Sequence, residues 1–327
     1  MDPKGLGKVA VVGAGAVGGY YGGMLARHGA DIHFLVRSDY EVAKRDGFTL
    51  KRGGETFSLP VQVYKDQVDI GRCDWVVVTL KSTANGALPA LLEPLVGEGT
   101  KILTLQNGFG NVCLLEKLYP QNPVFGGLCF VCINRVAPAV FANFLPGYVE
   151  MGAGQHGTVA MLTPLVNIWN LAVSQCRVVD PLEEALWRKL CWNIPFNGLA
   201  IAAGGVTTDK ILADESLVAQ CWGLMREIQE ASPHKIPDDF LQLQFENTFK
   251  MGAYRPSSLI DYLEGKAVEV EAIWGNPLRA AKERGYAMPG LEALYRELLA
   301  KLSGSQAGAA SQSPQKTSPT VPGRACP

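Results

Sequence analysis

Val9-Ala10-Val11-Val12-Gly13-Ala14-Gly15-Ala16-Val17-Gly18 decides the fold of this chain. A short β-branched run leads into glycines at the spacing G-x-G-x-x-G, and an apolar helix pattern follows. Gly13 permits a tight turn from strand to helix, Gly15 lets the backbone approach a pyrophosphate, and Gly18 lets the helix pack closely on the strand. The N–H groups and positive dipole end of that helix favour phosphate. Because a second strand pattern follows over residues 32–36, the stretch predicts a dinucleotide-binding βαβ unit rather than a merely structural glycine turn.

The bulk composition is that of an ordinary globular protein with room for two domains. The 327 residues are 47% hydrophobic and 19% charged, with a formal net charge of -1. This charge argues against a nucleic-acid partner, and no apolar run approaches the roughly 18 residues of a membrane span. The first residues enter the strand at once, which argues against a signal peptide and favours a cytoplasmic protein. The sequence leaves a homodimer open.

The cysteines and histidines do not indicate a metal site. Cys129 and Cys132 form the single C-x-x-C pair, and they lie in a strand-like run rather than at a helix start. A redox or zinc role would need partners that the spacing does not supply. Buried thiols in a reduced compartment are therefore favoured, and we expect no metal.

The end of the second strand indicates which nicotinamide cofactor is used. NAD-binding folds of this kind place an acid there to accept hydrogen bonds from the ribose hydroxyls. This chain instead has Arg37, which suits the 2′-phosphate of NADP through charge-assisted hydrogen bonds. Arg37 could also be a plain surface arginine, and nearby Asp39 keeps NAD open. The pattern favours NADP(H).

Two further loops are expected beside the cofactor. A strand over residues 74–81 ends at Lys81, and a strand over residues 101–105 is followed by Asn107. Ligands bind outside the carboxyl ends of such parallel strands, although Lys81 could be a solvated loop lysine and Asn-Gly is a common turn pair. The other expected elements are a hairpin over residues 47–63 with a Gly53-Gly54 turn, helices over residues 83–96 and 163–174, and strands over residues 124–134, 139–144, 148–151 and 177–179.

Helix signals dominate after residue 180. Asp180 is a suitable N-cap and Pro181 a suitable first helical residue. We therefore predict an α/β protein with an N-terminal Rossmann-type dinucleotide-binding domain over residues 1–180 and an all-helical substrate and catalytic domain over residues 181–302. Residues 303–327 are rich in Ser, Gly, Ala and Pro, and we expect them to form a disordered tail.

The first helix of the second domain carries a polar stripe. Lys189, Asn193 and Asn197 are spaced four apart, so they share one helical face among apolar neighbours. Such groups are costly to bury without partners, which leaves a solvent-facing edge or the wall of a polar cleft. The large aromatic residues around the asparagines favour the cleft. Pro195 should bend the helix near Cys191.

Candidate polar groups also occur later in the chain. Ser257 and Ser258 stand at an expected helix start, a location that favours anions. Glu269 and Glu271 follow in the next helix. Either glutamate could be an ordinary surface acid.

Together these motifs resemble the ketopantoate reductase family from about residue 8 to residue 302. The segments that carry the resemblance are Gly13-Ala14-Gly15-Ala16-Val17-Gly18, Val78-Thr79-Leu80-Lys81, Gln106-Asn107-Gly108, Leu186-Trp187-Arg188-Lys189-Leu190 with Asn193 and Asn197, Ser257-Ser258, and Glu269 ahead of Ala272-Ile273-Trp274-Gly275. As a set they are far more specific than the glycine loop alone.

The resemblance also implies roles for individual residues. It implies that the glycine loop, Arg37 and Lys81 bind NADP(H), with Arg37 and Lys81 at the 2′-phosphate. Asn107 would lie beside the nicotinamide and the substrate. Lys189 would be the catalytic acid, and Glu269 would sit beside the reacting oxygen. The residues implied to hold the substrate are Asn193, Asn197 and Ser258.

The activity that the resemblance implies is NADPH-dependent reduction of 2-dehydropantoate, a small 2-oxo acid, to pantoate for coenzyme A synthesis. Two enzymatic alternatives are a relative that reduces another 2-oxo acid and one that joins such an acid to an amine. A third alternative is a non-catalytic NADP sensor. The stripe that starts at Lys189 argues against a pure sensor, because sensing needs only the glycine loop of the first domain.

Overall fold

The glycine stretch folds as a strand, a turn and a helix. In the computed structural model, which describes residues 3–310, β1 (Lys8–Val12) leads into α1 (Ala16–Arg27), and β2 (Asp31–Leu35) follows. Gly13 has a φ of +99°, in the region that favours glycine. A Cβ on Gly18 would lie 2.2 Å from the Thr79 hydroxyl and 2.6 Å from the Gly13 carbonyl oxygen. The expected turn and the expected close packing are therefore both confirmed.

The sheet has ten strands around this unit. Its order is β4-β3-β9-β8-β7-β6-β1-β2-β5, with β10 paired to β9. The strands from β8 to β5 pair in parallel, whereas β8 and β9 form a long antiparallel pair. The bounds of the remaining strands are β3 (Phe48–Arg52), β4 (Glu55–Leu59), β5 (Gln62–Tyr64), β6 (Cys73–Val78), β7 (Val96–Thr104), β8 (Val124–Ala137), β9 (Val140–Ala153) and β10 (Gln175–Val178).

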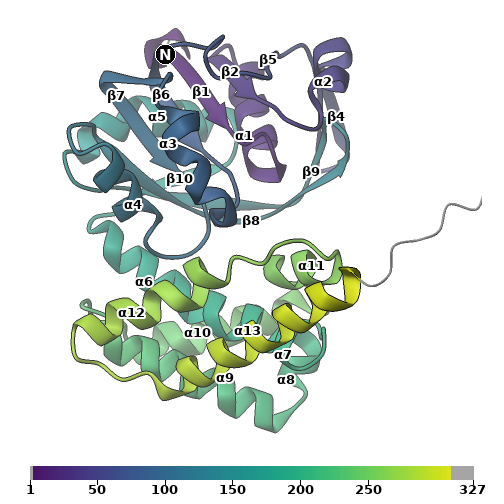
Figure 1. Cartoon of the computed structure of the whole chain (residues 1–327), viewed down its shortest axis with the longest axis vertical. Coiled ribbons are helices and arrows are strands. Elements are labelled where there is room, and N and C mark those ends of the chain that lie inside the picture. Colours follow the sequence, from purple (N-terminus) through teal and green to yellow (C-terminus); the bar gives the residue numbers. More distant parts are fainter. Residues whose placement is uncertain (1–2, 311–327) are drawn as a thin grey trace, which may run out of the picture.

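Helices cover both faces of this sheet (Figure 1). Val9 and Val11 of β1 face the core beneath α1 and α5 (Val159–Ala172), whereas Ala10 and Val12 face α3 (Leu88–Leu92) and α4 (Asn111–Leu118). The strand is thus apolar on both sides, as a buried parallel strand should be. A short helix, α2 (Tyr40–Asp46), follows β2, and a 3-10 turn, η1 (Pro3–Leu6), precedes β1.

Among the local predictions, the hairpin is confirmed and several others were imprecise or wrong. The hairpin with its Gly53-Gly54 turn is confirmed as β3 and β4. The single helix expected over residues 83–96 is instead a 3-10 turn, η2 (Ser82–Ala87), and the short α3, because Gly86 weakens the helix and Pro89 fits only a helix start. The strand after it begins at Val96 rather than at residue 101, and the two strands expected over residues 139–151 are the one strand β9.

The described chain after Pro181 is helical and packs around its own apolar core. It lies below the sheet in Figure 1, with α6 directly beneath α4 and β8. The α/β fold with an all-helical C-terminal part is therefore confirmed. The bounds are α6 (Leu182–Trp192), η3 (Asn193–Asn197), α7 (Gly198–Ala202), α8 (Thr208–Leu212), α9 (Glu215–Ala231), α10 (Asp238–Met251), α11 (Ser257–Leu263), η4 (Glu271–Gly275), α12 (Asn276–Glu283) and α13 (Pro289–Ala310).

The ends of this helical part differ from the expectation. Pro181, with extended backbone, is the residue that caps α6, so the prediction of Asp180 as N-cap was wrong by one residue. The last helix continues to Ala310, past the expected start of the tail at residue 303, and residues 311–327 lie outside the described chain. Within residues 3–310, no helix is long and apolar enough to cross a bilayer.

Candidate active site

One cavity of about 1980 Å³ lies between the sheet and the helical part of the chain. It opens at the carboxyl ends of β1 and β6, where a doubly wound sheet binds its ligands. The sequence-predicted residues that line it are Gly13, Ala14, Gly15, Ala16, Val17, Arg37, Lys81, Asn107, Lys189, Asn193 and Glu269. Residues far apart in sequence are thus brought to one space.

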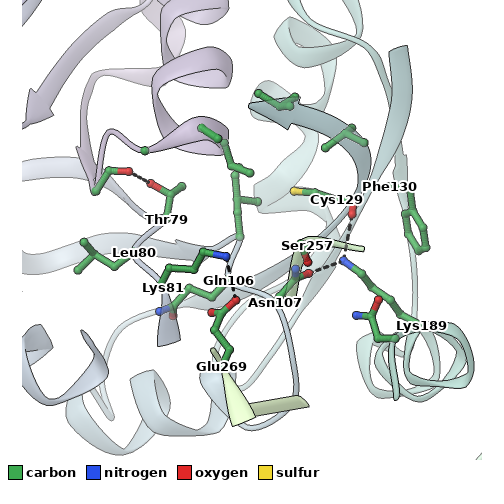
Figure 2. Close-up of a pocket in the computed structure, with 18 of the residues that line it drawn as sticks. Thr79, Leu80, Lys81, Gln106, Asn107, Cys129, Phe130, Lys189, Ser257 and Glu269 are labelled. Atoms are coloured by element: carbon green, nitrogen blue, oxygen red, sulfur yellow. Dashed lines mark hydrogen bonds and ion pairs between the residues drawn. The ribbon is translucent and has the colours of Figure 1, made fainter. Parts of the chain in front are cut away.

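The glycine loop offers backbone to this cavity. Gly15 has open space where a Cβ would stand, because the nearest atom is the Gly13 carbonyl oxygen at 4.0 Å. The Thr79 hydroxyl donates to that same carbonyl at 2.6 Å and holds the turn in place (Figure 2). No side chain caps the N-terminus of α1, and Ala16 and Val17 of its first turn line the cavity, so backbone N–H groups of this turn are available to a ligand. Bare glycine backbone at a helix N-terminus fits a dinucleotide pyrophosphate.

The cavity end beyond β2 carries Arg37 and Asp39. Arg37 is exposed and has no ion-pair partner among the described residues. Asp39 is only 5% exposed, and its two carboxylate oxygens already accept from Arg135 Nη1 at 2.8 Å and from the Ala139 N–H at 2.9 Å. Both carboxylate oxygens of Asp39 therefore bind groups of the β8–β9 pair. The arrangement favours a phosphate at Arg37 over ribose hydroxyls at Asp39.

Lys189 projects from α6 into the opposite side of the cavity. Its Nζ donates to Asn107 Oδ1 at 3.1 Å and to the Cys129 carbonyl oxygen at 3.0 Å (Figure 2). The Phe130 ring covers it, with its centroid 5.1 Å from Nζ. Burial lowers the pKa of Lys189, and the neighbouring Cys129, Glu150 and Glu269 oppose this only in part. An amine with a lowered pKa is suited to proton transfer.

The loop that brings Asn107 to Lys189 is docked on the helical part. The Phe109 N–H donates to the Ala272 carbonyl oxygen at 2.7 Å, and Asn276 Nδ2 donates to the Phe109 carbonyl oxygen at 2.8 Å. Gly108 has a φ of +92°, and a Cβ there would lie 2.5 Å from the Ala272 carbonyl oxygen. The Asn-Gly pair is thus more than a turn, because its glycine permits contact between the two parts.

The polar stripe bends after Lys189, as Pro195 predicted. Residues Asn193–Asn197 form a π-helix, η3, a distortion that is frequent at functional sites. Asn193 lines the cavity. Asn197 does not line it, because it is 2% exposed, donates to the Asn193 carbonyl oxygen and accepts from the Ser258 N–H at 3.1 Å. Ser258 is also buried behind the wall, and Ser257 is the serine that faces the cavity (Figure 2).

Two acids from the helical part reach across to Lys81. Lys81 Nζ lies 2.7 Å from Asp261 Oδ2 and 3.5 Å from Glu269 Oε2, and Glu269 Oε1 accepts from the Ser82 N–H at 2.7 Å. Although burial by itself lowers the pKa of Lys81, the two carboxylates outweigh it and raise the pKa. Glu271 lies outside the cavity, where it pairs with Arg279. Of the two glutamates, Glu269 is the one that lines the cavity.

Some cavity groups had no signal in the sequence. The Cys129 carbonyl is a backbone group on a strand, and Asp261 and Arg135 look like ordinary surface charges until the fold brings them to Lys81 and Asp39. Both thiols of the C-x-x-C pair are free, and the described residues contain no cluster of His, Cys, Asp and Glu that could hold a metal ion.

Comparison with known proteins identifies similar chains across both parts of the molecule. The family model described as "Ketopantoate reductase PanE/ApbA" matches residues 9–156, and its C-terminal counterpart matches residues 182–302. A 2-dehydropantoate 2-reductase of Nostoc sp. is 38% identical over 300 residues, which cover 89% of this chain and 94% of that protein.

Solved structures give the same result. The 2-dehydropantoate 2-reductase of Geobacter metallireducens superposes with a TM-score of 0.85 at 37% identity, covering 91% of this chain and 99% of that one. A D-mandelate dehydrogenase solved with NADH and anilino(oxo)acetate has a TM-score of 0.84 at 19% identity, covering 91% and 99%. The second likeness shows the fold alone.

Proposed function

Because the chain belongs to the ketopantoate reductase family, we propose that it reduces 2-dehydropantoate to pantoate with NADPH as a cytoplasmic enzyme of pantothenate and coenzyme A synthesis. The observation that carries this proposal is the position of Lys189. Its amine lies in the same cavity as the glycine loop, on the facing part of the molecule, and it is held by two neutral acceptor oxygens. A sensor of NADP would not need this arrangement.

The cofactor side of the cavity is formed by the first part of the chain. The backbone of residues 13–17 would hold the pyrophosphate of NADPH, and Arg37 would hold its 2′-phosphate. Lys81 is held by Asp261 and Glu269 in this structure, so its contact with the phosphate requires it to exchange these partners. When bound, NADPH supplies the hydride for reduction of the ketone.

The proton side is formed by Lys189. Negative charge develops on the ketone oxygen during reduction, and the protonated amine would stabilise this charge and deliver the proton. Asn107 Oδ1 and the Cys129 carbonyl oxygen hold Nζ in place. Because neither acceptor carries a full charge, they orient the amine without making its proton hard to release. Glu269 lines the same cavity and would sit beside the reacting oxygen.

The substrate would be held by groups of the helical part. Asn193 and the Ser257 hydroxyl face the cavity and can donate to carboxylate or hydroxyl oxygens. Asn197 and Ser258 hold η3 against α11 from behind through the bond between Asn197 Oδ1 and the Ser258 N–H. We therefore assign Asn197 and Ser258 a positioning role. They lie behind the cavity wall and hold in place the segments that carry Asn193 and Ser257, the side chains that would contact the substrate.

Turnover of NADPH with a panel of 2-oxo acids tests the proposal. Loss of nicotinamide absorbance should be fastest with 2-dehydropantoate. Faster loss with another 2-oxo acid, loss that requires an added amine, or no loss with any substrate would each favour one of the alternatives over ketopantoate reduction.

The assignment of Lys189 is tested with a matched pair of variants. Lys189→Met should lower kcat by about 10²–10⁴-fold, the range for general acid catalysis, with NADPH affinity nearly unchanged. Lys210→Met removes a lysine whose side chain is 70% exposed on α8, outside the cavity, and should retain full activity. Near-normal turnover of Lys189→Met would contradict the assignment.

A further inference from the structure

A second arginine stands at the ribose end of the cavity, beside the one that the sequence predicts. Arg135 lies on β8, close to the tip of the long β8–β9 pair, and lines the cavity together with Arg37 and Ser38. Its Nη1 donates to Asp39 Oδ1 at 2.8 Å and to the Ser38 hydroxyl at 3.2 Å. The fold thus joins β8 to the loop after β2, nearly one hundred positions away in sequence.

The guanidinium of Arg135 is fixed by a buried acid. The Asp39 side chain is 6% exposed, and its other oxygen accepts from the Ala139 N–H, so the carboxylate cannot turn away. The Arg135 side chain is 41% exposed, and it is one of the residues that line the cavity. An arginine has five N–H donors, and no described residue accepts from its Nη2 or Nε. These donors are available to a ligand in the cavity.

The charges at this end also favour an anion. An unpaired Asp39 would repel a 2′-phosphate, but Arg135 neutralises it, and Arg37 then adds a positive charge that no described residue pairs. Lys65, another cation that lines the cavity, is already paired with Glu41 at 2.6 Å. A phosphate placed at Arg37 would therefore have one guanidinium free and a second held beside it.

We propose that Arg135 is a further ligand of the cofactor's 2′-phosphate, beside Arg37, and contributes to the preference for NADPH over NADH. The inference rests on the proposed use of NADPH. Asp39 takes a supporting role, because it holds Arg135 in place instead of accepting the ribose hydroxyls.

The test measures binding of cofactor fragments rather than turnover. Calorimetry with 2′,5′-ADP and with 5′-AMP separates the contribution of the 2′-phosphate to the binding affinity from that of the rest of the nucleotide. Arg135→Met should weaken the binding of 2′,5′-ADP at least about tenfold, as expected for the loss of a hydrogen bond to a charged group. The affinity for 5′-AMP should stay unchanged. Arg135→Lys should retain part of the difference. Arg45→Met removes a positive charge on α2 outside this cavity and should change neither.

A double variant separates binding from neutralisation. If Arg135 served only to neutralise Asp39, Asp39→Asn/Arg135→Met would recover the affinity of the wild type for 2′,5′-ADP, and the proposal would be overturned. The proposal requires the double variant to bind 2′,5′-ADP as weakly as Arg135→Met does. Equal weakening of both fragments by Arg135→Met would also overturn it. Failure of the wild-type protein to prefer 2′,5′-ADP would instead count against the proposed use of NADPH.

Discussion

Replacing Gly108 by alanine should disable the site without touching a catalytic group. Gly108 follows Asn107 in the loop that docks on η4, and its φ is +92°. An added Cβ would lie 2.5 Å from the Ala272 carbonyl oxygen and 2.6 Å from the Ala272 carbonyl carbon and Cβ. These are mainly backbone atoms of a buried segment, so the loop has to move rather than its neighbour.

The size of the effect follows from these distances. To reach an ordinary contact of about 3.4 Å the Cβ must retreat from 2.5 Å, a shift of about 0.9 Å. If Asn107 follows, its distance of 3.1 Å to Lys189 Nζ exceeds hydrogen-bond range. A misplacement of about 1 Å can cost roughly 100-fold in rate. We expect a loss of that order in kcat, with stability reduced by about 1–3 kcal/mol from the strained φ and the overlap.

A matched glycine separates strain from docking. Gly99 has a φ of +76°, but nothing lies within 4 Å of its Cβ position. Gly99→Ala should therefore cost about 1–2 kcal/mol from the left-handed backbone alone and leave kcat unchanged. The assays are urea unfolding and NADPH turnover on both variants. If Gly108→Ala kept wild-type kcat, or if both variants lost activity equally, the role given to this contact would be refuted.

Three further predictions concern the two ends of the cavity. Arg37→Asp should shift the preference from NADPH towards NADH, because a carboxylate repels the 2′-phosphate and accepts from ribose hydroxyls; an unchanged ratio of kcat/KM values for the two cofactors would contradict this. The kcat of the wild type should fall as pH rises through the lowered pKa of Lys189, since only the protonated amine is an acid, and a pH–rate profile checks it. The pKa of Lys189 is lower in the folded protein than in the unfolded chain. At pH values between these two pKa values the unfolded chain binds more protons, so the free energy of unfolding should rise with pH in that range. Lys189→Met should lessen this rise, as measured by urea unfolding at several pH values, and should be no less stable than the wild type at neutral pH, because it buries no charge.

The local parts of this fold were predictable because they depend on neighbours in sequence. The glycine spacing, the Gly53-Gly54 turn and the proline at residue 195 each act through the backbone of a few adjacent residues. The same holds for the position of Lys189 and Asn193, because helical spacing alone puts them on one side. Where two local signals competed, as at Gly86 and Pro89, the predicted helix was wrong.

The rest of the site depends on contacts that no sequence spacing records. Asp39 was read as a group that could bind NAD, but its partners come from the β8–β9 pair. Asn197 shares the stripe of Lys189, yet the π-helix after Trp192 rotates it into the wall behind Asn193. Asp261 could not be assigned without knowing that α11 faces Lys81 across the cavity.

The two lysines of the cavity show how the surrounding acceptors set their roles. Lys81 and Lys189 are the same residue type in one cavity, and in both of them desolvation acts to lower the pKa. Lys81 meets the carboxylates of Asp261 and Glu269, so its pKa is raised and its charge is fixed over the working pH range. Lys189 meets an amide oxygen and a backbone carbonyl, so its pKa stays lowered and its proton can leave. When the pKa values of two titratable groups in one site are shifted in opposite directions, the groups take different roles. The group that keeps its charge binds a ligand, and the group that can release its proton acts as the catalytic acid. On this ground the proton that reaches the ketone oxygen comes from Lys189, and Lys81 serves to bind anions or the facing acids.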